Sequence, residues 1–316
     1  MNQPDQQGGD GGRDIPAQDT EPTRAGGLGP GRRLRALDEL IDGEGDPAVA
    51  DALRALDRAA LASAPLPDPS IIRQSGPFTS IEAYFRSALR QFGELLRLTG
   101  LKPRQAVLDY GCGMGRMALP LAAYLDPELG RYCGVDTDAR SIEVNRRLLG
   151  GRDHLRFEHV DLFNSMYNPD GAPMAQLETL DLGERFDLAF LFSVFTHVLE
   201  DDSAPLLRFL ARHLEPGATL VSTWFLLNPQ SQRGIDEGLA KFRFPFERGG
   251  GIRVNHRETP EGAVAYPEDA ALARLDACGF AVEQVIPGHW AGTRTSRMGQ
   301  DVIVARRRGS PSAGSR

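Results

Sequence analysis

Short hydrophobic runs alternate with amphipathic segments along most of the chain. Five runs predict strands, at residues 106–110, 131–136, 155–160, 186–193 and 218–226. Amphipathic segments before and between these runs predict helices at residues 81–98, 115–125, 139–149 and 204–214. Regular alternation of this kind is typical of a parallel sheet with helices on both faces. We therefore predict a doubly wound α/β fold.

The C-terminal part extends this pattern in a different way. An amphipathic helix ending at Gly279 is followed by two further runs, at residues 281–286 and 300–306. Because no helix separates the two runs, they can pair antiparallel. The prediction is a seven-stranded Rossmann-like sheet with an antiparallel C-terminal edge strand, which a plain dinucleotide-binding fold lacks.

The ends of the chain differ in composition from this core. Residues 1–30 are dominated by Gly, Pro, Asp and Gln without periodic hydrophobic positions, which predicts a disordered tail. Residues 31–70 contain helical periodicity and then a Pro-rich stretch, so we expect a helical extension and a linker. The extension is expected to be a packing appendage or lid without chemistry of its own, and a binding module is the alternative. The main domain is predicted at residues 71–306, with a disordered basic tail at 307–316.

Length and charge narrow the function classes. The chain has 316 residues and a net charge of −7, which disfavours binding to nucleic acid. It shows neither a membrane-spanning hydrophobic stretch nor a secretory signal, so we expect no membrane partner and a cytoplasmic location. Three cysteines without metal-ligand spacing predict neither zinc nor a disulfide framework, and no metal is expected. The few lysines among many arginines suggest a bacterial source; the oligomeric state cannot be inferred.

The sequence "VLDYGCGMGR" places three glycines, Gly111, Gly113 and Gly115, directly after the first predicted strand. In doubly wound sheets this turn borders the ligand, and glycine permits unusual dihedrals and close approach of a ligand. Free amides at the start of the next helix favour an anionic group. The dinucleotide-binding motif G-x-G-x-x-G would require glycine at position 116, where this chain has Arg116. This difference argues against a nicotinamide dinucleotide as the ligand. A glycine-rich turn without a ligand is the alternative.

Two aspartates follow the next strands. Asp136 ends the second strand, where a carboxylate can accept hydrogen bonds from both hydroxyls of a ribose. Asp161 follows the third strand, where its carboxylate can accept from an adenine amine, with Leu162 and Phe163 beside the ring. Alternatively, each aspartate caps the turn that follows it.

With these positions in place, the chain resembles the class I S-adenosylmethionine-dependent methyltransferases over about residues 80–306. The matching segments are "VLDYGCGMG", Asp136, "VDLFN", "FDLAFLFSVFTHV" and "LEPGATLVSTWFLLN". The chain is especially similar to a bacterial subgroup with motifs that appear here as "GCGMGR", "YNPDG" and "SVFTH". An ordered set of motifs is far more specific than one motif.

The resemblance implies a role for residues around the turn. Asp109 and the turn Gly111–Gly115 would hold the methionine portion of S-adenosylmethionine, with Ser193 beside it or beside the sulfonium. Tyr110 departs from the small or aliphatic residue that is frequent in the family, and we expect it to pack against the cofactor.

The resemblance also assigns the adenosine portion. Asp136 and Thr137 would hold the ribose, and Asp161 with Leu162 the adenine.

Transfer to an alcohol requires removal of a proton, for which histidine is well suited. His197 is the first choice as catalytic residue because it follows the fourth strand; His256 and His289 are further candidates. Alternatively His197 holds its loop by hydrogen bonds, and alignment of the reactants does most of the catalytic work. The acceptor site is expected within residues 227–266, unless its aromatic residues only bury the loop.

The resulting hypothesis is an enzyme that transfers a methyl group from S-adenosylmethionine to an oxygen or nitrogen of a small molecule or sugar. Two alternatives are a non-catalytic S-adenosylmethionine-binding protein and, on weaker grounds, an NAD-dependent oxidoreductase.

Overall fold

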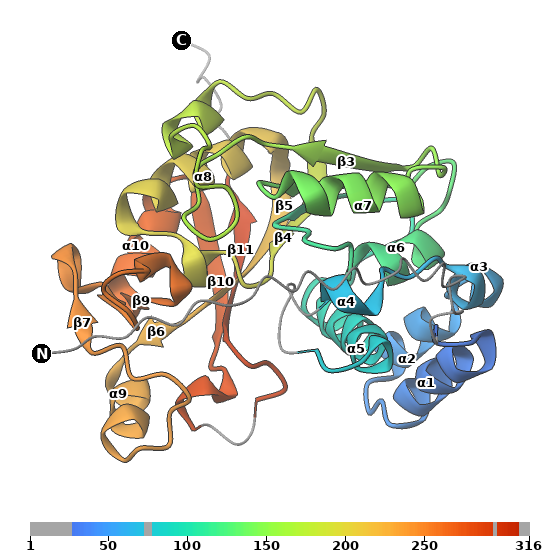
Figure 1. The fold of residues 1–316 in the computed structure, drawn as a ribbon, viewed down its shortest axis with the longest axis horizontal. Helices are drawn as coiled ribbons and strands as arrows, with labels where there is room; N and C mark the ends of the chain where they lie inside the picture. Colours follow the sequence, from blue (N-terminus) through green and yellow to red (C-terminus); the bar gives the residue numbers. More distant parts are fainter. Residues whose placement is uncertain (1–26, 73–77, 293–295, 310–316) are drawn as a thin grey trace, which may run out of the picture.

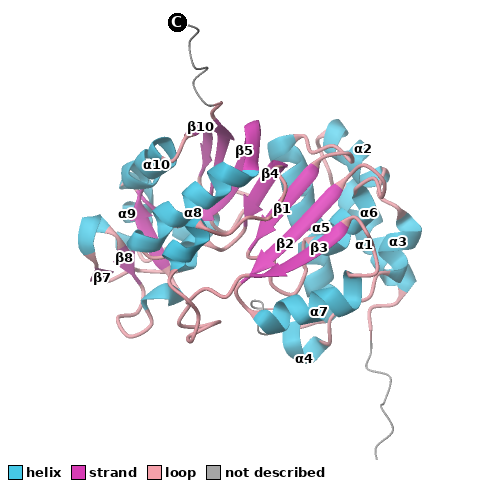
Figure 2. Ribbon diagram, turned by 90° about the horizontal axis from the view of Figure 1, so that it is seen from above, coloured by secondary structure: helices cyan, strands magenta, loops and turns pink. Residues whose placement is uncertain are grey.

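The computed structural model describes residues 27–72, 78–292 and 296–309, and a seven-stranded sheet forms its centre (Figures 1 and 2). The predicted terminal tails lie largely outside the described residues. The strands of this sheet are β1 (Ala106–Tyr110), β2 (Arg131–Asp136), β3 (Leu155–His159), β4 (Phe186–Leu191), β5 (Leu214–Trp224), β10 (Phe280–Ile286) and β11 (Asp301–Arg307).

The order of these strands is β10-β11-β5-β4-β1-β2-β3. Strands β1 to β5 pair in parallel, whereas β11 is antiparallel to both β5 and β10. The predicted Rossmann-like sheet is thus confirmed. The C-terminal strand inserts between β5 and β10, so that β10 forms the edge.

Helices cover both faces of the sheet, and alternate residues of β1 point to opposite faces. Val107 packs into one hydrophobic cluster and Leu108 into the other. The first face is covered by α5 (Ile81–Thr99), α6 (Ala118–Tyr124) and α7 (Ala139–Leu149), and the second by α8 (Glu200–His213) and α10 (Glu268–Ala277).

Local signals set the ends of α5, the helix that leads into β1. The Ser80 hydroxyl accepts a hydrogen bond from the amide of Ala83, and Gly100 ends the helix in a left-handed conformation (φ 60°). Because α5 leads directly into β1, its C-terminal end lies at the start of that strand. Its N-terminal end therefore lies at the opposite edge of the sheet, where β1 ends.

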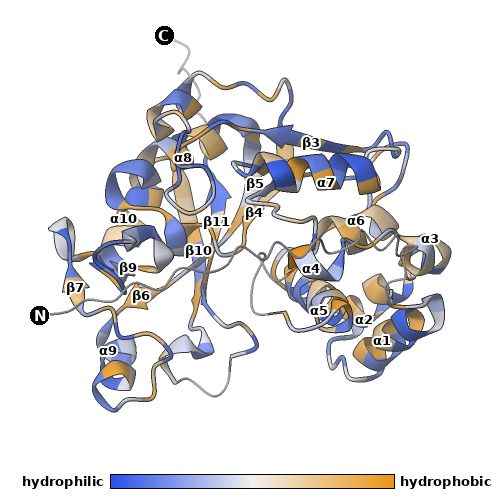
Figure 3. Ribbon diagram, viewed as in Figure 1, coloured by the Kyte–Doolittle hydropathy of each residue, from blue (hydrophilic) through white to orange (hydrophobic). Residues whose placement is uncertain are grey.

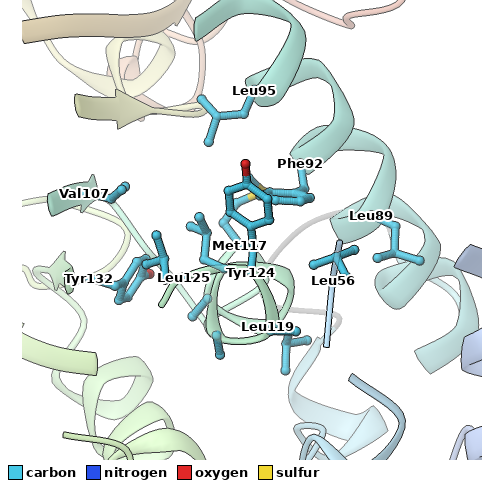
Figure 4. Packing of buried hydrophobic residues seen from close by; sticks show 14 of the residues in the cluster. Leu56, Leu89, Phe92, Leu95, Val107, Met117, Leu119, Tyr124, Leu125 and Tyr132 are labelled. Carbon is cyan, nitrogen blue, oxygen red and sulfur yellow. The ribbon is translucent and has the colours of Figure 1, made fainter. Parts of the chain in front are cut away.

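The N-terminal region forms α1 (Pro30–Asp42), α2 (Pro47–Arg54), α3 (Arg58–Ser63) and α4 (Pro69–Ile72) beside α5 and α6 (Figure 1). Hydrophobic and hydrophilic residues alternate around α1, α2 and α5 (Figure 3). Leu37, Leu53 and Leu61 are fully buried in the same cluster as Val107. Figure 4 shows part of this cluster, in which Leu56 from the N-terminal region lies among residues of α5 and α6. These helices therefore belong to the main core.

The segment after β5 forms a second, smaller sheet in the order β6-β9-β8-β7. Its strands are β6 (Leu226–Leu227), β7 (Phe246–Glu247), β8 (Arg253–Val254) and β9 (Val264–Pro267), and α9 (Pro229–Asp236) accompanies them. Short 3₁₀ helices are η2 (Met174–Glu178), η3 (Phe195–His197), η4 (Gly249–Gly251), η5 (Pro260–Gly262) and η6 (His289–Ala291). Phe225, Phe244 and Trp290 form a separate hydrophobic cluster here.

Across the described ranges, no helix combines the length and hydrophobicity that crossing a bilayer requires. The same residues contain no group of three or more histidine, cysteine, aspartate or glutamate side chains placed to hold a metal ion.

Shortening Leu61 to alanine tests whether the N-terminal helices and the sheet unfold together. Leu61 is 0% exposed, so we expect Leu61→Ala to lower the free energy of unfolding by about 3 kcal/mol. Both tryptophans, Trp224 and Trp290, lie outside these helices, and their fluorescence during urea unfolding should report the loss. Leu129→Ala, at a site 49% exposed, should leave the midpoint unchanged. An unchanged tryptophan midpoint in Leu61→Ala would show that the helices unfold independently.

Candidate active site

The turn after β1 requires glycine at three positions. Gly111, Gly113 and Gly115 have φ values of 83°, 49° and 74°, which side chains rarely adopt. A Cβ at Gly111 would lie 2.4 Å from Val194 Cγ2, and one at Gly115 would lie 2.3 Å from Asn145 Oδ1. A Cβ at Gly113 would meet nothing within 4 Å. The main chain at Gly113 therefore borders open space at the carboxyl edge of the sheet, where a ligand can approach it.

Side chains from neighbouring helices hold this turn in place. The Tyr84 hydroxyl on α5 donates a hydrogen bond to Met114 O (2.8 Å). Asn145 Nδ2 on α7 donates to Gly113 O (2.7 Å). Tyr84 is fully buried, so it supports the turn from the protein interior.

Asp136 at the end of β2 links that strand to the turn. Its Oδ2 accepts a hydrogen bond from the Gly113 amide (2.7 Å), and its Oδ1 accepts from the Asp138 amide (2.9 Å). Burial is the main cause that raises the pKa of Asp136. Thr137 follows directly and is also partly buried. The structure thus brings Asp136 and Thr137 next to the glycine turn.

Asp109 and Tyr110 occupy successive positions at the end of β1 and point to opposite faces. Asp109 is 3% exposed and accepts a hydrogen bond from the Tyr132 hydroxyl (2.7 Å). Burial, partly offset by this bond, raises the pKa of Asp109 to about 7. Tyr110 packs edge-on against Phe209 of α8, with ring centroids 5.8 Å apart, and its buried hydroxyl has no hydrogen-bond partner among the described residues.

The segment after β3 forms a closed loop, residues 161–172. Asp161 is exposed and accepts a hydrogen bond from Asn168 Nδ2 (2.8 Å), whereas Leu162 is buried. The Phe163 amide donates to Ala172 O (2.7 Å), which closes the loop.

This loop presents three large hydrophobic side chains, Phe163, Met166 and Tyr167, each more than 40% exposed. Burial and the charges of Asp136 and Asp138 raise the pKa of Tyr167, which places its hydroxyl within electrostatic reach of the β2 end. Met166 and Tyr167 were not among the predicted site residues, although "YNPDG" had marked the segment.

At the end of β4, Ser193 adopts a left-handed conformation (φ 63°) that is uncommon for serine. Its amide donates to Thr223 Oγ1 (2.7 Å), and its hydroxyl donates to Gln300 Oε1 (3.1 Å). Gln300 Nε2 lies 3.4 Å from Thr196 Oγ1. A strained residue held by several hydrogen bonds is a feature of functional sites. No local pattern could have indicated Gln300, which lies 107 positions after Ser193.

His197 lies in η3 and its ring is fixed by the main chain of η5. Nδ1 lies 2.7 Å from Glu261 O. Because a carbonyl oxygen only accepts, Nδ1 carries the proton and Nε2 of the neutral ring keeps its lone pair. Burial lowers the pKa of His197, so the ring is neutral at pH 7. The Glu261 carboxylate accepts in turn from the Ser165 hydroxyl.

The aromatic residues in and near residues 227–266, the segment in which the acceptor site was predicted, have mainly packing roles. Phe244 and Tyr266 are fully buried, and the Tyr266 hydroxyl donates to Val198 O (2.7 Å). Trp290 Nε1 donates to Asp301 Oδ2 (2.7 Å). His256 is exposed and lies 2.9 Å from the Asn255 amide nitrogen. Phe244 and Trp290 belong to the separate cluster beside the smaller sheet, whereas Tyr266 packs into the cluster on the second face of the main sheet.

A sequence model of the methyltransferase domain matches residues 82–265, which include the glycine turn and the ends of β2 and β4. The chain belongs to the methyltransferase domain family. It is an enzyme of methyl transfer, and the matched region begins in α5 and ends in β9 of the smaller sheet.

Several solved structures resemble this methyltransferase. An S-adenosylmethionine-dependent methyltransferase from Methanosarcina mazei shares 19% identity, covering 66% of this chain and 95% of its own, with a TM-score of 0.45. Magnesium protoporphyrin IX methyltransferase from Synechocystis shares 18% sequence identity, and the match covers 73% of this chain and 89% of that protein, with a TM-score of 0.45. An amino pentose methyltransferase from Micromonospora echinaspora shares 16% sequence identity, and the match covers 75% of this chain and 95% of that protein, with a TM-score of 0.47.

The raised pKa of Asp109 predicts a specific pH dependence of stability. The unfolded chain releases this proton near pH 4, whereas the folded protein retains it up to about pH 7. The buried carboxyl therefore lowers the free energy of unfolding progressively as the pH rises through that interval. Asp109→Asn keeps an oxygen that can accept from Tyr132 but cannot ionise. The free energy of unfolding of the variant minus that of the wild type should rise between pH 4 and 7 and then level off; a constant difference would contradict this assignment.

Proposed function

We propose that this methyltransferase transfers a methyl group from S-adenosylmethionine to an oxygen or nitrogen of a small molecule or sugar. The observation that carries the proposal is the open space at Gly113, bordered by a left-handed main chain and the Asp136 carboxylate. The motifs "GCGMGR", "YNPDG" and "SVFTH" support membership in the bacterial subgroup that shares them.

The residues present suit each portion of the cofactor. We assign the ribose hydroxyls to Asp136 and Thr137, because the Asp136 carboxylate keeps free lone pairs beside its bonds to the amides of Gly113 and Asp138. The loop 161–172 is placed to bind the adenine, with Asp161 as acceptor and Phe163 as an exposed ring beside it. The methionine portion then extends over Gly113 toward Ser193. Leu162 and Tyr110 contribute by fixing the backbone, since both are buried.

The cofactor supplies an activated methyl group on a sulfonium, which is transferred by in-line displacement. The protein must orient the acceptor and exclude water from it. Ser193, Thr196 and Gln300 form a neutral hydrogen-bonded group at the end of β4 that can orient a polar acceptor. Met166 and Tyr167, the other exposed hydrophobic side chains of the loop 161–172, can cover its nonpolar part. These neutral and hydrophobic surfaces support an uncharged or weakly charged small-molecule acceptor.

We assign to His197 the removal of the proton from the acceptor. Its Nε2 lone pair is available because Nδ1 is committed to Glu261 O. The lowered pKa keeps the ring unprotonated at neutral pH. Turnover should therefore decline only as the pH falls below about 6.5.

Replacing Asp136 tests the ribose assignment. We expect Asp136→Asn to weaken binding of S-adenosylhomocysteine by about 10-fold or more, because the amide loses the charge-assisted bonds to the ribose hydroxyls. Isothermal titration calorimetry measures the change. Asp153→Asn, at an exposed site before β3, is the matched control and should bind as the wild type does. Equal affinities of Asp136→Asn and wild type would rule out the assignment.

A pair of His197 variants separates proton transfer from positioning. The Asn side-chain amide in His197→Asn can still donate to Glu261 O but has no basic nitrogen. If His197 is the base, His197→Asn and His197→Ala should both lose about 100-fold or more in turnover at unchanged cofactor affinity. If the histidine only holds its loop, His197→Asn should retain most activity and His197→Ala should not. The measurement is kcat with labelled S-adenosylmethionine and an acceptor found by screening.

A further inference from the structure

One residue of the inserted segment, residues 227–266 after β5, contacts two separate parts of the proposed site. Glu261, in η5, accepts a hydrogen bond at its carboxylate from the Ser165 hydroxyl in the loop 161–172. Its main-chain oxygen accepts a second bond from Nδ1 of His197 in η3 (2.7 Å). Ser165 and His197 lie 96 and 64 positions before Glu261 in the chain. The fold therefore joins the loop after β3 to the turn after β4 through a single residue.

The bond from Ser165 is unfavourable to break because the Glu261 carboxyl is buried. Glu261 is 6% exposed, and burial raises its pKa. Arg248 acts on this carboxyl electrostatically, but within the described ranges the two groups form no ion pair, and the Ser165 hydroxyl is the side-chain donor that the carboxyl has. Opening the loop would leave a buried carboxyl without this donor. The loop after β3 is therefore firmly attached to η5.

The main chain around Glu261 is fixed on both sides. The Gly262 amide donates to Thr259 O (2.9 Å), which closes η5. The Asn255 amide donates to Ala263 O (3.1 Å), directly before β9 pairs with β8. Because these bonds restrict η5, its carboxyl and its main-chain oxygen move together. A shift of the carboxyl therefore also shifts the oxygen that holds the histidine ring.

The loop 161–172 is compact at the end that carries Ser165. The Asn164 side chain accepts from the amides of Met166 and Tyr167 (3.0 and 3.1 Å), so that these residues form a tight turn. The side chains of Met166 and Tyr167 are both exposed. A ligand that contacts them thus acts on the same turn as the bond to η5.

We infer that Glu261 is a positioning residue that couples closure of the loop 161–172 over the cofactor to the orientation of the His197 ring. The inference rests on the proposed function, which assigns the adenine to this loop and proton removal to His197. Binding of the cofactor stabilises the closed loop, and the Ser165 hydroxyl then holds the carboxyl of η5. The main-chain oxygen of the same residue keeps the proton on Nδ1 and leaves the Nε2 lone pair free. The base is thus oriented when the methyl donor is present.

Exchange of the His197 Nδ1 proton with water tests the coupling in the wild-type protein, because this proton exchanges only when its bond to Glu261 O opens. NMR of protein with 15N-labelled histidine detects the proton, and His197→Asn identifies its signal among the six histidines. Addition of S-adenosylhomocysteine should slow the exchange about 10-fold or more. A signal that becomes visible only in the complex is the same result.

The inference and the proposed function fail in different ways in this experiment. If calorimetry shows that S-adenosylhomocysteine binds but the proton exchanges as fast as before, the inference is overturned and the proposed function stays intact. If the compound does not bind at all, the proposed function is refuted and the inference fails with it.

Variants of the bond test the route of the coupling. Ser165→Ala and Glu261→Ala remove its donor and its acceptor. Both should bind S-adenosylhomocysteine within about 10-fold of wild type, while the slowing of exchange falls below about 2-fold. Glu261→Gln keeps a side-chain oxygen that can accept from Ser165, so it should retain the slowing. Glu258→Ala, at an exposed position of the inserted segment, is the control and should respond as wild type does.

Slowing of wild-type size in both Ser165→Ala and Glu261→Ala would mean that the ligand orients the histidine by another route, which overturns the inference. Thermal unfolding of each variant monitors folding. If Glu261→Ala does not fold, Ser165→Ala decides, because it removes one hydroxyl from an exposed residue and leaves η5 unchanged.

Discussion

The hydrogen bond from the Gly113 amide to the Asp136 carboxylate is the interaction on which the site depends. It joins the end of β2 to the turn after β1 and holds the main chain in a left-handed conformation beside open space. The same carboxylate retains lone pairs for a ligand. A single side chain thus shapes the turn and offers a recognition group, because parallel neighbouring strands end at the same edge of the sheet.

The surrounding structure stabilises this arrangement from both faces. Tyr84 and Asn145 hold the turn from α5 and α7, and the N-terminal helices pack on α5 in the same hydrophobic cluster. The smaller sheet fixes His197 through Glu261 O. The helical extension and the inserted segment therefore act on the proposed site by positioning α5 and His197, while the groups that we propose to contact the ligand follow the strands.

Hydrophobic periodicity was enough to predict the main sheet. The strands β1 and β2 have the predicted bounds, because each is a buried run ending at a glycine turn or an acidic turn. The helix preceding β1 was also predicted within one residue, since Ser80 and Gly100 mark its ends. Contacts between segments far apart in the sequence could not be predicted from such patterns. The bonds of Gln300 to Ser193 and of Glu261 to His197 depend on how the C-terminal and inserted segments fold back. Likewise, the supporting role of Tyr266 depends on its burial and on the bond from its hydroxyl to Val198 O, 68 positions earlier in the chain.

A crystal structure with S-adenosylhomocysteine tests the central claim most directly. The account predicts the ribose hydroxyls on the Asp136 carboxylate, the adenine against the loop 161–172, and the thioether passing over Gly113. A structure in which the compound binds elsewhere, or in which the space at Gly113 is filled by the protein's own side chains, would contradict it.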